Sequence, residues 1–153
     1  MHMHGRRLIA GLLLAIATAF VATLAEAQVL PSSYTPVGIC SLFSGPLAAN
    51  STLHLRVRGS CGIPETANAV TLIAATTGSA ANGALYAWDS GILQPGIPSM
   101  FYRVAPGGDS STLVVRLCYP FLECSDVSMS ARLTASAFLT LSAVGYFEPF
   151  PSE

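Results

Sequence analysis

The segment from Cys61 to Leu72 constrains the fold of this chain more than any other stretch. Its first residue is a cysteine, which can form a covalent link, and Gly62 can adopt backbone angles that other residues avoid. Pro64 fixes its own φ angle and biases the preceding residue toward an extended conformation. From Ala69 the chain carries no charge until Asp89, and this run is rich in β-forming residues. The segment therefore predicts an anchored turn that leads into a buried strand.

The first 27 residues have the features of a secretory signal peptide. Two arginines precede an uncharged apolar run from Leu8 to Leu24, and Ala25-Glu26-Ala27 supplies a small-x-small cleavage pattern. We expect residues 1–27 to be removed, so that the mature chain begins at Gln28. The alternative is an uncleaved anchor, but the apolar run is near the lower limit for a membrane span.

The mature chain carries little charge. The full sequence has 7 Lys and Arg and 8 Asp and Glu, so removing Arg6, Arg7 and Glu26 leaves five arginines, seven acids and no lysine. Nucleic acids and anionic membranes recruit proteins through clustered basic residues, and this chain has no such cluster. We therefore expect neither as a partner after signal cleavage.

All four cysteines lie in the mature chain, at Cys40, Cys61, Cys118 and Cys124. An even number in an exported chain indicates two disulfides, for which three connectivities are possible. We favour Cys40–Cys61 with Cys118–Cys124, because each bond closes a local loop, worth about 3 and about 2 kcal/mol in the chain-entropy model. A zinc site is the alternative, but no C-x-x-C pair is present, and we expect no metal and no cofactor.

About eight short strands separated by turn residues are expected, with no long amphipathic helix. The first begins near Val37, and the others lie at about Thr52–Gly59, Val70–Thr77, Ala84–Asp89, Ser99–Val104, Ser111–Cys118, Val127–Leu133 and Ala137–Phe147. This pattern predicts an all-β protein: a single disulfide-stapled β-sandwich, jelly-roll or Ig-like, over residues 37–153. Residues 28–36 are expected to form an extended leader.

Two of these strands carry predictions about burial. From Thr52 to Gly59 apolar and polar residues alternate, which places His54, Arg56 and Arg58 together on the polar face. The strand from Val70 to Thr77 is apolar throughout, so we expect it to be buried on both sides.

The segments Gly59-Ser60-Cys61-Gly62-Ile63-Pro64 and Gly145-Tyr146-Phe147, with Ala67, Ala69-Val70 and Gly83-Ala84-Leu85 between them, form a pattern in one frame. In this pattern the chain resembles a domain found widely in bacterial exported and cell-surface proteins, over roughly Pro36 to Glu148. The resemblance implies an exported β-sandwich with the first and second cysteines paired. It implies no catalytic residues.

Sequence motifs of catalysis are absent. The mature chain has a single histidine, His54, and two arginines on its predicted face would disfavour the imidazolium that a general base must become. No G-x-S-x-G, H-E-x-x-H, P-loop or dinucleotide-binding motif occurs. The acids Asp89, Asp109, Glu123 and Asp126 are in or beside predicted turns, where solvated carboxylates are common. We therefore expect no enzymatic activity, with a small hydrolase as a remote alternative.

Aromatic residues offer the main candidate binding site. Tyr86 and Trp88 lie two residues apart on one predicted strand face, and Phe101 and Arg103 lie on the next strand. Flat rings beside a guanidinium can stack on a sugar or line a protein interface. The alternative is that Tyr86 and Trp88 fill the core.

The leader suggests a second mode of action. Exposed sheet edges are normally protected by charge, especially lysine, and this chain has little such protection. Val29, Leu30 and Tyr34 could seat in the groove of a neighbouring copy while the leader adds a strand to its sheet. We therefore expect a secreted or cell-surface module that acts by binding or extracellular assembly, with itself or another surface protein as partner. The alternative is a carbohydrate-binding module whose partner is a polysaccharide.

Overall fold

The structure, a computed structural model, describes residues 32–104, 107–118, 124 and 127–149. The expected signal peptide and the residues Val29 and Leu30 lie outside this part of the chain. The described residues form eight strands: β1 (Ser32–Leu47), β2 (Thr52–Leu55), β3 (Ala69–Thr77), β4 (Gly83–Asp89), β5 (Met100–Tyr102), β6 (Asp109–Arg116), β7 (Met129–Leu133) and β8 (Ala137–Pro149). The prediction of an all-β chain is confirmed.

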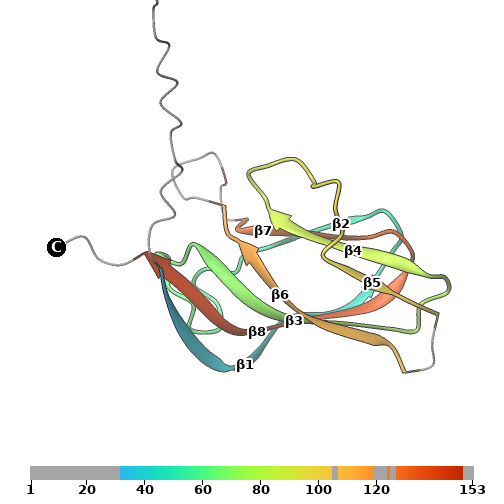
Figure 1. Ribbon diagram of the computed structural model, residues 1–153, viewed down its shortest axis with the longest axis horizontal. Helices are drawn as coiled ribbons and strands as arrows, with labels where there is room; N and C mark the ends of the chain where they lie inside the picture. Colours follow the sequence, from blue (N-terminus) through green and yellow to red (C-terminus); the bar gives the residue numbers. More distant parts are fainter. Residues whose placement is uncertain (1–31, 105–106, 119–123, 125–126, 150–153) are drawn as a thin grey trace, which may run out of the picture.

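The strands form two antiparallel sheets that pack face to face (Figure 1). One sheet has the order β1-β8-β3-β6 and the other the order β2-β7-β4-β5. The pairings β1 with β8, β2 with β7, β3 with β6 and β4 with β5 are nested, as in one long hairpin rolled up on itself. This is the topology of a jelly roll, which decides between the two predicted kinds of sandwich.

The core lies between the sheets and is built by alternation along each strand. In β3 the side chains of Val70, Leu72 and Ala74 are fully buried. Ile73, between them, is partly exposed on the opposite face, because the second sheet covers only one side of this strand. The prediction that β3 is buried on both sides is therefore wrong for part of its outer face.

The first strand begins earlier than predicted. Ser32–Pro36 pair with Pro149–Gly145 of β8, so this part of the expected leader is already a strand of the chain's own sheet. The ring of Tyr34 lies 5.1 Å from that of Phe147, and its hydroxyl donates to the carbonyl oxygen of Val144. Gly145 leaves room for this ring, since a Cβ there would meet it at 2.4 Å. The described part of the expected leader is therefore paired with β8 of the same chain.

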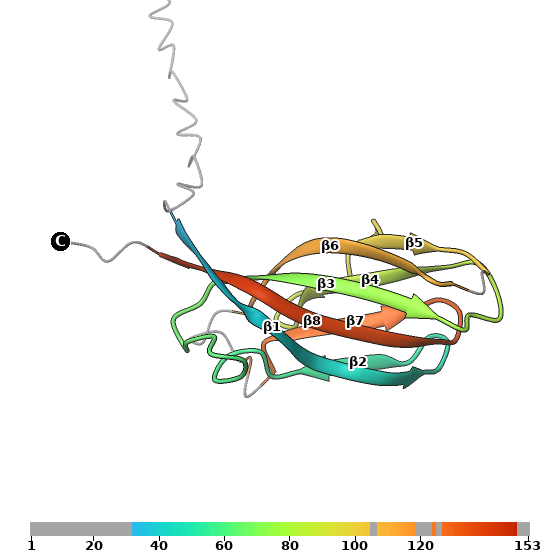
Figure 2. The same ribbon diagram turned by 90° about the horizontal axis from the view of Figure 1, so that it is seen from below.

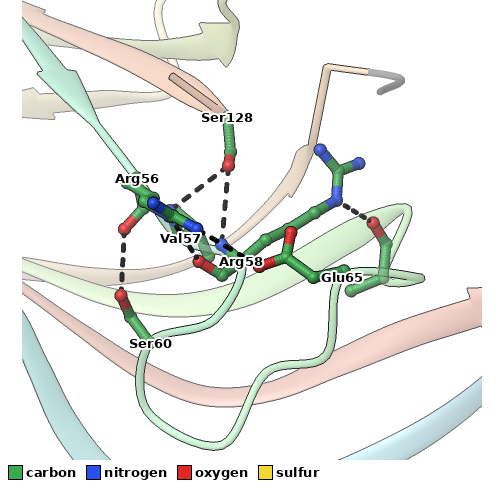
Figure 3. Close-up of polar contacts among 7 residues, drawn as sticks. Arg56, Val57, Arg58, Ser60, Glu65 and Ser128 are labelled. Atoms are coloured by element: carbon green, nitrogen blue, oxygen red, sulfur yellow. Dashed lines mark hydrogen bonds and ion pairs between the residues drawn. The ribbon is translucent and has the colours of Figure 1, made fainter. Parts of the chain in front are cut away.

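The connection between β2 and β3, residues 56–68, corrects the prediction for Arg58 (Figure 3). The strand ends at Leu55, because the N–H groups of Val57 and Arg58, two and three residues further on, donate to the hydroxyl oxygen of Ser128, at 3.3 and 3.5 Å. Arg58 is buried, and its Nε donates to the carbonyl oxygen of Ala67 at 2.8 Å. Its guanidinium thus stabilises the 56–68 connection from the buried side, and Arg58 does not share a polar face with His54.

Both expected disulfides are present, Cys40–Cys61 and Cys118–Cys124, with Cα–Cα distances of 5.6 and 6.0 Å. The first ties β1 to the 56–68 connection, and the second closes a small loop between β6 and β7. Disulfides are typical of proteins that work outside the cytoplasm. In the described part of the chain no helix has the length and apolarity needed to cross a membrane.

Candidate binding surface

Exposed large apolar side chains are concentrated in one short segment. Of the ten found among the described residues, five lie between positions 92 and 104: Ile92, Leu93, Ile97, Phe101 and Val104. The side chains of Leu93 and Ile97 are 92% and 81% exposed. We call residues 92–104 the apolar segment. It comprises most of the β4–β5 loop, the edge strand β5 and the two residues that follow this strand.

The start of the loop is fixed to the end of β4 and to the second disulfide. The carboxylate of Asp89 accepts a hydrogen bond from Gly91 N at 2.8 Å, and Ser90 Oγ donates to the carbonyl oxygen of Val127 at 2.6 Å. Gly91 lies directly against the disulfide, because a Cβ at this position would meet Cys118 Sγ at 2.4 Å. The chain therefore leaves β4 in a fixed direction.

The middle and end of the loop are also held by hydrogen bonds. Arg132 Nη1 on β7 donates to Gln94 Oε1 at 2.8 Å, which brings the loop over the outer face of its sheet (Figure 1). Ser99 N donates to the carbonyl oxygen of Leu85 at 2.8 Å, and Ser99 Oγ accepts from Ala87 N at 3.0 Å. The exposed apolar side chains are thus presented by a backbone that is anchored at both ends and between them.

Phe101 and Arg103, two of the predicted binding residues, are exposed. The ring of Phe101 is 74% exposed on β5, and Arg103 follows the strand. Arg103 N donates to Asp109 Oδ2 at 2.6 Å, and its guanidinium lies 3.4 Å from the other carboxylate oxygen. This exposed ion pair marks the polar end of the apolar segment.

Tyr86 and Trp88 lie on the outer face of the sheet rather than in the core. Their neighbours on β4, Leu85 and Ala87, point into the core cluster instead. Trp88 is nevertheless only 9% exposed, and Tyr86 is half-buried. The loop folds over this face, since its contact residue Arg132 is directly opposite Tyr86. Trp88 is therefore not presented for stacking, although it is outside the core.

The structure also reveals a contact that the sequence did not suggest. His54 Nδ1 and Ser130 Oγ lie 3.0 Å apart as directly opposite residues of β2 and β7. Ser130 is buried, and no acid is hydrogen-bonded to the ring of His54 in the described part of the chain. Nucleophilic catalysis requires an accessible nucleophile and an oriented base, so this pair is better explained as a cross-strand contact.

The candidate acids do not form a catalytic pair where the structure describes them. Asp89 caps the β4–β5 loop and Asp109 binds Arg103, while Glu123 and Asp126 lie outside the described residues. No group of His, Cys, Asp and Glu in the described residues is arranged to hold a metal ion.

The sequence reasoning missed Ile92, Leu93 and Ile97 because they stand in a Pro- and Gly-rich break between strands. A loop so rich in large apolar residues was the available signal.

Comparison of the chain with protein-family models, with curated proteins and with solved structures found no match. Functional conclusions therefore rest on the surface described above.

Proposed function

We propose that this protein is a non-catalytic, secreted or cell-surface β-sandwich module that binds a protein partner through the apolar segment. The exposure of five large apolar side chains within residues 92–104 is the observation that carries this proposal. Soluble monomers rarely leave such residues clustered on their surface unless a partner covers them. Binding residues are also commonly placed on loops that a rigid scaffold positions.

The anchoring of the loop supports the same function. Ordering a flexible loop on binding costs conformational entropy, and a loop that is already ordered avoids much of that cost. The bonds from Asp89, Arg132 and Ser99 provide such preorganisation. Action outside the cytoplasm is supported by the two disulfides, by the signal-like first 27 residues and by the resemblance to exported bacterial domains.

The proposal is tested by removing the most exposed apolar side chains. The mature protein and a Leu93→Ser/Ile97→Ser variant are immobilised and compared for binding of surface proteins extracted from the producing cells. Burial of a Leu or Ile side chain contributes about 1.5–3 kcal/mol, so loss of both side chains should weaken binding by more than about a hundredfold.

An Ile39→Ser/Val114→Ser variant is the matched control, because it also removes two exposed apolar side chains, both outside the apolar segment. It should bind as well as the unmodified protein. Equal losses in both variants, or unchanged binding in the Leu93/Ile97 variant, would show that the apolar segment is not the binding site.

Carbohydrate binding is the second candidate, favoured by the exposed ring of Phe101 near the guanidinium of Arg103. The burial of Trp88 removes the stronger of its expected stacking residues. Binding to a glycan array that is lost in Phe101→Ala but kept in Leu93→Ser/Ile97→Ser would favour this function over the first.

A further inference from the structure

The N-terminal part of β1 pairs with the end of β8, at a place that does not involve the apolar segment. We call residues Ser32–Pro36 the exchange segment. It pairs with the last five residues of β8 and forms the edge of this sheet, while β3 pairs with Gly145–Phe147 from the other side of β8 (Figure 2). The ring of Tyr34 fills the space above Gly145 and contacts Phe147. The two ends of the described chain are thus held together mainly by this pairing.

A pivot follows the exchange segment directly. Pro36 pairs with Gly145 and Cys40 with Ala143, so that three residues of β1 stand opposite one residue of β8. Within this irregularity, no atom lies within 4 Å of a Cβ placed on Gly38, and Ile39 is largely exposed. Neither residue has a register partner on β8, so the pairing of β1 with β8 is interrupted at this point.

The first disulfide fixes the chain immediately after the pivot. Cys40 is bonded to Cys61, so the remainder of β1 stays attached to its own molecule when the residues before it move. The chain therefore has a fixed part, a short irregular pivot and a terminal strand segment, which are the elements of strand exchange between identical copies.

We propose that the exchange segment can leave its own β8 and pair with β8 of a second copy of this chain. Every contact of the closed form is then made again between the two molecules, with Tyr34 of one copy above Gly145 of the other. No residue of β1 is charged, so the segment brings no charge repulsion to the second molecule. The pivot spans about 10 Å when extended, which requires the two bodies to lie side by side.

The proposal is independent of binding through the apolar segment, because it involves other residues and another edge of the molecule. It also revises the expected role of Tyr34, which serves both the closed and the exchanged form. In either form an exchange segment is paired with the end of β8, so exchange needs no vacant groove.

Disulfide trapping between copies tests the exchange. Ser33 and Glu148 are register partners before the pivot, while Ser41 and Ser142 are register partners after it. Mature Ser33→Cys and Glu148→Cys proteins are mixed in equal amounts under mild oxidation, and Ser41→Cys and Ser142→Cys proteins are treated in the same way. The first mixture should give several-fold more crosslinked heterodimer than the second, because only residues before the pivot can exchange.

A second measurement uses both cysteines in one chain. The Ser33→Cys/Glu148→Cys double variant should be locked in the closed form and stay monomeric by light scattering at high concentration. The Ser41→Cys/Ser142→Cys double variant should retain the concentration-dependent dimer of the unmodified protein. Equal crosslinking in both mixtures, no crosslinking in either, or a monomeric unmodified protein at all concentrations would overturn the proposal.

Discussion

The same tripeptide, Gly-Ile-Pro, occurs in two connections of this jelly roll with opposite results. In the β2–β3 connection Ile63 is 2% exposed and belongs to the core, whereas in the β4–β5 loop Ile97 is 81% exposed. Both connections contact the segment between β6 and β7, through Ser128 and Val127 respectively. Local sequence is therefore a poor guide to burial in these two loops.

The difference lies in the backbone on the N-terminal side of each isoleucine. Cys61 and Gly62 both have left-handed φ angles, +57° and +73°, and these turn Ile63 inward. Ile63 N also donates to the carbonyl oxygen of Ser60 at 2.9 Å, and its own carbonyl accepts from Gly59 N at 2.8 Å. Gly96 has no left-handed φ angle, and its loop is anchored through other residues. One connection is thus folded into the core, and the other is held above the sheet.

Replacing each isoleucine by alanine should give the largest difference in stability between the two connections. Ile63→Ala leaves a cavity in a fully packed site and should lower the free energy of unfolding by about 2–5 kcal/mol. Ile97→Ala removes an exposed side chain and should change it by no more than about 0.5 kcal/mol. Urea unfolding followed by tryptophan fluorescence measures both. Similar losses in the two variants would mean that Ile97 is also packed.

Removing each disulfide should have a smaller effect, with an order set by the loop that it closes. Cys61→Ser opens a sequence separation of 21 residues and should cost about 3 kcal/mol, against about 2 kcal/mol for Cys118→Ser and its separation of 6. The unreduced protein should show no free thiols in a DTNB titration. Two reactive thiols in native protein, or a reversed order of the two costs, would contradict this assignment.

The smallest effect concerns the two glycines of the exposed loop. A Cβ at Gly91 would collide with Cys118 Sγ, so Gly91→Ala should lower stability by about 1–3 kcal/mol. No atom lies within 4 Å of a Cβ at Gly96, and Gly96→Ala should be neutral or stabilise by up to about 1 kcal/mol. Thermal unfolding of both variants gives the comparison. A stable Gly91→Ala protein would show that the loop is not seated on the disulfide.

The strands with clear alternation were predictable because alternation is a local property. The Met129–Leu133 strand and the strand starting at Ala137 were expected at nearly the positions observed, and both expected disulfides formed. Strand ends were less predictable where a distant side chain decides them. Ser128 ends β2 by accepting hydrogen bonds from the residues after Leu55, a contact that spans about seventy positions.

The candidate site was predictable only in part for the same reason. Strand alternation accounts for the exposure of Phe101, which lies between the buried residues Met100 and Tyr102. The burial of Trp88 on the outer face has no such local signal, and the β4–β5 loop is held near this face by Arg132 on another strand. The pairing of Tyr34 with the end of the chain likewise has no local signal.

The nesting of the strands has a consequence for the order of folding. Ser32 and Pro149, which are paired at the open end of the roll, stand 117 positions apart in the chain. Synthesis proceeds from the N-terminus, so β1 emerges first and its ladder partner β8 emerges last. Closing so long a loop is entropically costly and slow, whereas the hairpin of β4 and β5 can form early. The outermost strand of this protein therefore spends the whole of synthesis without its hydrogen-bonding partner.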